Sequence, residues 1–237
     1  MAHHDRIDGV RPVLEALRAG RRRIHRIEIS RRKGSPGLKA LAELATERQV
    51  PWIEVSGGES TASAEADPFP EEPFEALLGP SGPRRLVALD RVTDVGNLGS
   101  IARSAVAAGM TGLLLEHHHA PPIGPGALRA SAGALEHLRV GRTPNLARSL
   151  ALARDEGLRV LGAVPGGLAL RDLEGSWLSG DLIWVFGSED RGLRAAVERC
   201  LEVRVGIPMA GSLQSLGVAA AAAHLLLQTA ERREGRD

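Results

Sequence analysis

The sequence predicts an α/β protein with a mostly parallel sheet that is covered by helices on both faces. Two short apolar runs near the end of the chain, residues 182–186 and 203–207, each lead into a loop rich in Gly, Ser, Pro and Glu. Short apolar runs that stop at Gly or Pro are typical of buried parallel strands. From residue 84 onward such runs alternate with segments of helical periodicity. Because open α/β sheets bind ligands at the carboxyl ends of their strands, the two loops mark the expected site.

The remaining elements of this part of the chain follow from the same two periodicities. Strands are expected at residues 86–89, 112–115, 159–164, 181–186 and 203–207, and helices at 97–108, 127–133, 145–156, 191–200 and from 215 onward. The last helix reads VAAAAAHLLLQTA, which is apolar nearly all round and is therefore expected to be buried. Three consecutive histidines at 117–119 cannot all face one ion, and no cysteine or acidic ligand set accompanies them, so no metal site is expected.

The first 60 residues predict a separate small α/β domain with a basic rim. Helices are expected at 10–19 and 39–48 and strands at 24–29 and 51–55. Twelve Lys and Arg stand against eight Asp and Glu, and seven of these bases fall within residues 21–33. Such a run is either a solvated face or a surface that neutralises RNA phosphates. Residues 61–83, rich in Pro, Gly and acids, are expected to form a linker to a second domain at 84–237.

Composition limits the remaining possibilities. At 237 residues, 43% of them hydrophobic, the chain fits one large or two small domains with a packed core. It has no apolar run near the length of a membrane span, and its start has no apolar core of a secretory signal. The single cysteine, Cys200, excludes an internal disulfide and is typical of a reducing cytoplasm. A cytoplasmic location is therefore expected.

Three stretches occur in the order of one family's sequence motifs. They are DVGNLGSIAR at residues 94–103, GSEDRGL at 187–193 and IPMAGSLQSLGVA at 207–219. Together they resemble the SPOUT-class RNA 2'-O-ribose methyltransferases of the SpoU/TrmH type, over roughly residues 84–232. The resemblance implies a C-terminal trefoil knot, a homodimer that packs through the last helix, and S-adenosylmethionine (AdoMet) as cofactor. It also implies that residues 1–60 form a substrate-binding domain shaped like ribosomal protein L30e and shortened, because a His-Gln-Gly stretch is missing.

The resemblance also assigns the residues of the site. The residues with implied catalytic roles are Asn97, Arg103, Glu189 and Ser215. The residues implied to bind the adenine of the cofactor, here called the adenine slot, are Ala163, Gly187, Ile207, Met209 and Leu216. Alternatives remain for two of these residues, since Asn97 is also a typical helix N-cap and Glu189 can cap the helix expected from residue 191. Because a guanidinium stays protonated, Arg103 is expected to anchor a phosphate and polarise the hydroxyl rather than remove its proton.

The sequence departs from the family pattern in the first and third motifs. Val95 stands where Pro is usual, Gly217 stands where the family has Asn, and Ala219 stands where it has Ser. The expected activity is 2'-O-ribose methylation of structured RNA, with a 23S ribosomal RNA guanosine favoured over transfer RNA. Two alternatives stay open: a relative that binds RNA with reduced or no turnover, motivated by Gly217 and Ala219, and an antibiotic-resistance methyltransferase acting on the same RNA. A Rossmann-type methyltransferase is disfavoured, because no G-x-G loop follows an early strand.

Overall fold

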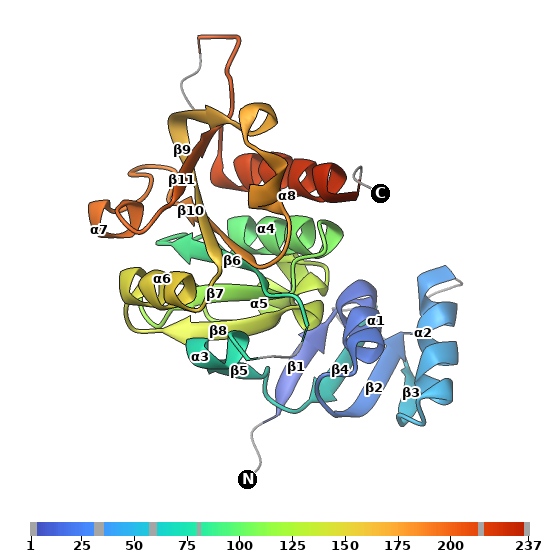
Figure 1. Cartoon of the computed structure of the whole chain (residues 1–237). Helices are drawn as coiled ribbons and strands as arrows, with labels where there is room; N and C mark the ends of the chain where they lie inside the picture. The colour runs from blue at the N-terminus through green and yellow to red at the C-terminus, as the bar shows by residue number, and fades with distance from the viewer. Residues whose placement is uncertain (1–3, 31–35, 57–60, 80–81, 213–215, 235–237) are drawn as a thin grey trace. The chain divides into compact units, whose positions relative to one another are not determined.

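The chain forms two compact units, and the first of them is built from two separate stretches of sequence (Figure 1). The computed structural model describes residues 4–30, 36–56, 61–79, 82–212 and 216–234. The N-terminal unit comprises Met1–Pro70 and Pro122–His137, and the C-terminal unit comprises Glu71–Pro121 and Leu138–Asp237. The chain therefore leaves the N-terminal unit, returns to it between two strands of the other unit, and leaves it again.

The N-terminal unit is a four-stranded sheet in the order β1-β4-β2-β3. Its elements are β1 (Asp5–Asp8), α1 (Val10–Ala19), β2 (Ile24–Ser30), α2 (Pro36–Glu47), β3 (Trp52–Val55), β4 (Ala62–Ala66), α5 (Pro125–Ala130) and a 3-10 helix, η1 (Ala134–His137). β4 is antiparallel to β1 and β2, whereas β2 and β3 are parallel. α1 buries one apolar stripe and ends at Gly20, which has a left-handed φ of 61°. The helices and strands predicted within residues 1–60 are confirmed.

The prediction of a linker over residues 61–83 is wrong. β4 lies inside this stretch and fills the place between β1 and β2, and the C-terminal unit begins with β5 (Glu71–Pro73) and α3 (Phe74–Leu77). The sequence of β4, Ala-Ser-Ala-Glu-Ala, has little strand propensity. Its small side chains are nevertheless buried under α1, so tertiary packing decides the conformation. Phe74 and Leu77 are buried in the core of the C-terminal unit.

The C-terminal unit is a seven-stranded sheet in the order β11-β9-β10-β6-β7-β8-β5, and all of its paired strands are parallel. Its further elements are β6 (Arg85–Asp90), α4 (Val95–Ala107), β7 (Gly112–Glu116), β8 (Arg139–Thr143), α6 (Leu146–Asp155), β9 (Arg159–Ala169), η2 (Leu170–Asp172), η3 (Gly175–Leu178), β10 (Leu182–Gly187), α7 (Ala195–Glu198), β11 (Val203–Gly206) and α8 (Val218–Glu234). The predicted α/β fold with a mostly parallel sheet is confirmed.

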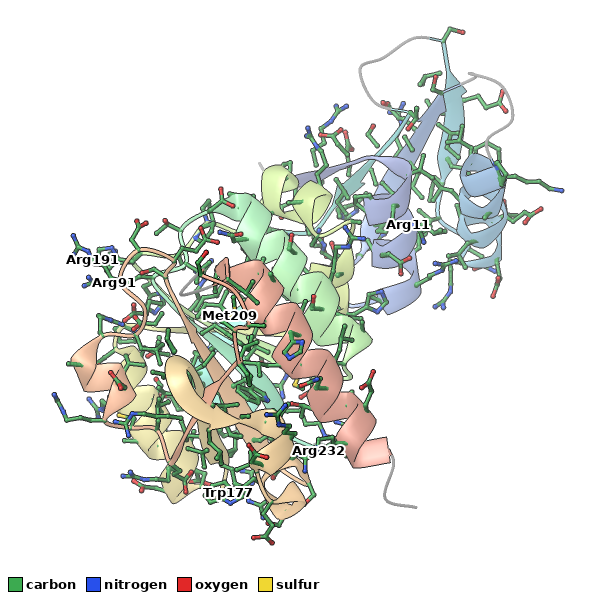
Figure 2. All side chains as sticks on the ribbon, turned by 90° about the horizontal axis from the view of Figure 1, so that it is seen from above. Arg11, Arg91, Trp177, Arg191, Met209 and Arg232 are labelled. Carbon is green, nitrogen blue, oxygen red and sulfur yellow. The ribbon has the colours of Figure 1, made fainter. Side chains whose placement is uncertain are left out.

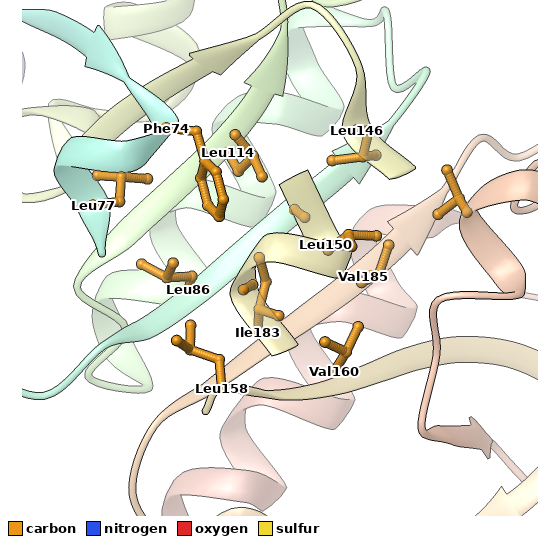
Figure 3. Close-up of a cluster of buried hydrophobic side chains, with 13 residues drawn as sticks. Phe74, Leu77, Leu86, Leu114, Leu146, Leu150, Leu158, Val160, Ile183 and Val185 are labelled. Carbon is orange, nitrogen blue, oxygen red and sulfur yellow. The ribbon is translucent and has the colours of Figure 1, made fainter. Parts of the chain in front are cut away.

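The core of this unit has two layers because side chains alternate across each strand. Ile183 and Val185 of β10 lie in a buried cluster with Leu146 and Leu150 of α6 and with residues of α3 (Figure 3). The intervening residues of β10, among them Trp184, are also fully buried, on the other face of the sheet. There α4 and α8 pack against each other, and the views of Figures 1 and 2 both show them side by side. Helices thus cover both faces, as predicted.

Three predicted boundaries need correction. The helix expected at 191–200 is only the single turn of α7, because residues 188–192 form a tight loop closed by a bridge between Ser188 and Gly192. The strand expected at 159–164 continues to Ala169 as β9. The last helix begins at Val218 rather than Ser215, and Ser215 itself lies outside the described residues. No helix in the described ranges is long and apolar enough to span a membrane.

Candidate cofactor and catalytic site

The loop after β10 is built around two glycines. A Cβ at Gly187 would lie 2.3 Å from the carbonyl carbon of Gly192, a separation that no side chain tolerates. Gly192 has a φ of 64°, and its N–H donates to the carbonyl oxygen of Ser188 at 2.8 Å. Glycine is therefore required at 187 by close backbone approach and favoured at 192 by the left-handed conformation. This tight turn places Glu189, Asp190 and Arg191 beyond the carboxyl end of the strand.

A cavity of about 450 Å³ opens where the loops after β10 and β11 come together beside the middle of β9. All five residues predicted for the adenine slot line it: Ala163, Gly187, Ile207, Met209 and Leu216. Its other walls include Phe186, Val205, Val218 and Leu225, which are apolar and buried. Met209 and Leu216 are large apolar side chains that are 36% and 40% exposed, and Figure 2 shows where Met209 lies. Apolar side chains left exposed at the mouth of a cavity are typical of a ligand site.

A buried ion network anchors the loop after β10 to the neighbouring strands. The backbone N–H and Nε of Arg194 donate to the two carboxylate oxygens of Asp90, at 2.8 and 2.6 Å, and its Nη2 lies 2.8 Å from Oε1 of Glu116. Asp90 ends β6 and Glu116 ends β7. The side chain of Asp90 is fully buried, whereas that of Arg194 is 32% exposed. Burial acts to lower the pKa of Arg194, but the contact with Glu116 and the charge of Asp90 outweigh it and raise that pKa.

These three residues were not predicted from the sequence. Their positions in the sequence could have indicated them. Asp90 and Glu116 are the only acids at the ends of two otherwise apolar expected strands. Arg194 directly follows the second motif. Asp90 also pairs in register with Gly187 on the adjacent parallel strand. The loop that leads to the first motif and the loop that lines the cavity therefore start from the same edge of the sheet.

Glu189 caps a helix, but not the one expected. Its Oε1 accepts a hydrogen bond of 3.0 Å from the backbone N–H of Val218, the first residue of α8. The interpretation of Glu189 as a cap for a helix starting at 191 is therefore wrong. The side chain also lines the cavity. A carboxylate at a helix N-terminus satisfies an otherwise unpaired donor and interacts favourably with the helix dipole.

The first motif forms the beginning of α4. Asp94 is the N-cap, and its side chain accepts a hydrogen bond of 2.7 Å from the backbone N–H of Asn97. The alternative interpretation of Asn97 as the N-cap is therefore wrong. Within the described part of the chain, the carboxamide of Asn97 makes no hydrogen bond, and Arg103, which is exposed, has no acidic partner. Neither residue is among the described residues that line the cavity.

The basic segment of the N-terminal unit divides into structural and exposed residues. The side chain of Arg22 is 2% exposed and lies 2.5 Å from Glu136 and 3.1 Å from Asp5, and its guanidinium stacks over Phe69. Arg22 therefore cannot contact phosphates, which corrects its place in the predicted RNA surface. Arg23 and Arg26 are exposed. Arg31, Arg32 and Lys33 lie outside the described residues.

The fold and the cavity together define an α/β protein with a cavity of ligand size at the carboxyl ends of parallel strands. Residues 84–227 match the model of the SpoU rRNA methylase family, and residues 6–62 match that of the RNA 2'-O-ribose methyltransferase substrate-binding domain. The chain thus belongs to the SpoU rRNA methylase family, a class of RNA methyltransferases that use AdoMet.

Relatives agree with this assignment. An uncharacterised tRNA/rRNA methyltransferase of Mycobacterium avium is 41% identical over 70% of this chain, which spans 53% of that protein's length. The 23S rRNA (guanosine-2'-O-)-methyltransferase RlmB of Pseudomonas putida is 30% identical over 99% of both chains. The crystal structure of the SpoU methyltransferase AviRb from Streptomyces viridochromogenes, in complex with AdoMet, superposes with a TM-score of 0.79 at 26% identity, covering 98% of this chain and 91% of that one.

The cavity fits the methyl donor of the family. Its volume lies within the range of small-molecule sites, roughly 300–1,000 Å³. Its apolar walls suit an adenine ring, and the absence of a side chain at Gly187 lets a ligand approach the backbone. The acid Asp190 at its rim suits the positive charge of a sulfonium or an amino group.

Proposed function

We propose that the protein is an AdoMet-dependent 2'-O-ribose methyltransferase that acts on a guanosine of 23S ribosomal RNA. The observation that carries the proposal is the cavity lined by all five residues assigned to the adenine slot. When bound there, AdoMet supplies an electrophilic methyl group. The substrate is proposed from the RlmB of Pseudomonas putida, which aligns with the whole chain, and from the match to a substrate-binding domain at residues 6–62.

The catalytic residues are proposed on the exposed part of α4 and on the cavity rim. A ribose 2'-hydroxyl is a weak nucleophile at neutral pH, so the protein must orient it and assist the loss of its proton. Arg103 has an unpaired guanidinium among the described residues, which suits the RNA phosphate beside the target ribose. Asn97, in the first turn of the same helix, offers a carboxamide to the hydroxyl. Glu189 and Ser215 complete the proposed set, Glu189 by positioning the cavity wall rather than by touching the reacting atoms.

The quaternary structure and topology are proposed from the same resemblance. We propose a homodimer that packs through α8, a trefoil knot in the last third of the chain, a cytoplasmic location and no metal requirement. Leu227 of α8 is 41% exposed, which supports an interface on this helix. Sedimentation equilibrium should give twice the 25.1 kDa of one chain at micromolar concentration, and a species of 25.1 kDa alone would contradict the dimer.

We propose that the N-terminal unit is the L30e-like RNA-binding domain. Its exposed arginines are proposed to contact the RNA. The double substitution Arg23→Ala, Arg26→Ala should weaken RNA binding and lower the slope of log K against log salt by about 1 to 2. The variant carries its native Arg22, so the fold of the unit is kept. An unchanged slope would exclude this surface.

The decisive test is ribose-methylation mapping of 23S RNA by mass spectrometry, in cells with and without the gene. Loss of one 2'-O-methylguanosine on deletion, and its return with purified protein and AdoMet, is the expected result. Methylation of transfer RNA alone would contradict the proposed ribosomal substrate and identify transfer RNA as the substrate instead. An RNA that binds without being methylated would favour the non-catalytic alternative suggested by Gly217, and methylation tied to drug tolerance would favour a resistance role.

A further inference from the structure

Glu189, in the loop after β10, lies next to Gly217, the residue directly before α8. The carboxylate of Glu189 reaches from the loop after β10 to the first backbone N–H of α8, with a 3.0 Å hydrogen bond to Val218. We infer that Glu189 is a positioning residue that ties this loop to α8, and that Gly217 is present because it leaves room for that contact. The inference rests on the proposed placement of AdoMet in the cavity.

The steric part of the inference concerns the space around Gly217. A Cβ at this position would lie 2.9 Å from Oε1 of Glu189, closer than real side-chain contacts allow. The nearest atom is the end of a flexible side chain rather than backbone, so a larger residue at 217 would be accommodated by turning Glu189 away. The cost of that movement is the hydrogen bond to Val218, because the same oxygen makes both contacts.

Gly217 occupies a helix position at which Gly and the family's Asn have different consequences. The backbone N–H of Ala221 donates to the carbonyl oxygen of Gly217 at 3.0 Å, so Gly217 is the N-cap of α8. Asn is among the best N-cap residues, because its side chain accepts a hydrogen bond from the helix's own first turn. An Asn at 217 would cap α8 from within, whereas Glu189 caps it from a neighbouring loop. The two arrangements compete, because a side chain at 217 requires the Glu189 carboxylate to move from its present position.

The choice between them affects the cavity. Glu189 belongs to one wall, and Leu216, Val218 and Ala221 belong to the other. With the cap supplied by Glu189, one hydrogen bond joins the two walls and stabilises the α8 terminus at once. With a cap supplied by residue 217, α8 keeps its stability, but the hydrogen bond between Glu189 and Val218 that joins the two walls is lost. Restoring the family's Asn is therefore expected to weaken AdoMet binding rather than to improve the enzyme.

A double-mutant cycle separates this role from the alternatives. AdoMet affinity is measured by calorimetry for wild type, Glu189→Ala, Gly217→Asn and the double variant, and the urea midpoint of each apoprotein is recorded. Glu189→Ala alone should weaken AdoMet by about five-fold, the fold-change equivalent to one helix cap, because AdoMet binding must then restore the order that the cap supplies. Gly217→Asn should weaken it by a similar factor while leaving the urea midpoint unchanged or higher. In the Gly217→Asn background, Glu189→Ala should have no further effect on either quantity.

Two further variants act as controls. Gly124 is the N-cap of α5, and a Cβ there meets nothing within 4 Å. Gly124→Asn makes the same substitution at an unopposed cap, so it should leave AdoMet affinity at the wild-type value. Glu189→Gln keeps an acceptor oxygen without the charge, so it should retain most of the affinity that Glu189→Ala loses.

The outcomes are distinguishable. Equal effects of Glu189→Ala in both backgrounds, or tighter AdoMet binding in Gly217→Asn, would overturn the inference. An equal loss in Glu189→Gln and Glu189→Ala would assign the carboxylate to direct contact with the cationic ligand and would overturn it as well. Failure of wild type to bind AdoMet would instead refute the proposed function. In that case the urea midpoints still test the capping, since Glu189→Ala should lower the midpoint only when residue 217 is Gly.

Discussion

The ion network behind the cofactor loop gives the sharpest quantitative prediction. In Asp90→Asn the side chain keeps its shape, but the carboxylate that accepts two hydrogen bonds from Arg194 becomes a carboxamide with one acceptor. One Arg194 donor then faces an NH2 group. Breaking a buried ion pair by removing one partner costs about 3–5 kcal/mol when the other partner is left uncompensated.

Two features of the structure reduce that figure for Asp90→Asn. Arg194 keeps Glu116 as a partner, and its side chain is 32% exposed, so water compensates part of its charge. We therefore expect a loss of about 2 kcal/mol in the free energy of unfolding, near that of one hydrogen bond to a charged group. Because the loop that Arg194 anchors also lines the cavity, AdoMet affinity should fall by about ten-fold.

The assay is urea unfolding followed by circular dichroism, with AdoMet calorimetry on the same preparations. Arg204→Ala provides the control, since Arg204 forms a similar pair with Glu198 at 2.9 Å but both side chains are exposed. That variant should lose less than about 1 kcal/mol. If Asp90→Asn loses no more stability than Arg204→Ala, the network does not anchor the loop and the reasoning fails.

Three further predictions concern the cavity, the first motif and acid stability. Leu216→Arg should abolish AdoMet binding in calorimetry, because a charge would enter an apolar wall; undiminished affinity would move the ligand elsewhere. Arg103→Ala should abolish methyl transfer in a tritium-transfer assay with AdoMet affinity within about two-fold of wild type, and Arg103→Lys should rescue poorly; wild-type turnover in Arg103→Ala would refute its assignment. Burial acts to raise the pKa of Asp181, but hydrogen bonds from Arg84 outweigh it and lower that pKa, so the stability it contributes is lost as pH falls through the folded value. Asp181→Asn should therefore flatten the pH dependence of the urea midpoint below about pH 4, and an unchanged profile would contradict this.

The parallel sheet and the cavity were predictable from the sequence because both depend on local patterns. The runs at 182–186 and 203–207 are continuous and apolar, as buried strands require, and each stops at residues that end a strand. The loops that follow could be assigned to one site because parallel strands present their carboxyl ends at one edge. For this reason Gly187, Ile207 and Leu216 were expected together, and the structure brings them together around the cavity.

Other parts of the structure depend on partners that are distant in the sequence. β4 is a strand because β1 and β2 lie on either side of it, and its alanines carry no signal of that pairing. Arg22 looked like one more base of a basic run, but Glu136, more than a hundred residues later, buries it. The capping of α8 by Glu189 also needed the structure, because it depends on the space that Gly217 leaves.

The return of the chain to the N-terminal unit between β7 and β8 sets the order in which the protein can fold during synthesis. The buried Arg22 pairs with Asp5 from the start of the chain, but its second carboxylate arrives only with Glu136, and α5 and η1 arrive with the same segment. A nascent chain of 70 residues has all four strands of the first sheet, but its Arg22 still lacks this partner. On the ribosome, the N-terminal unit is therefore completed only after residue 137 has left the exit tunnel, by which time β5, β6 and β7 have also been made.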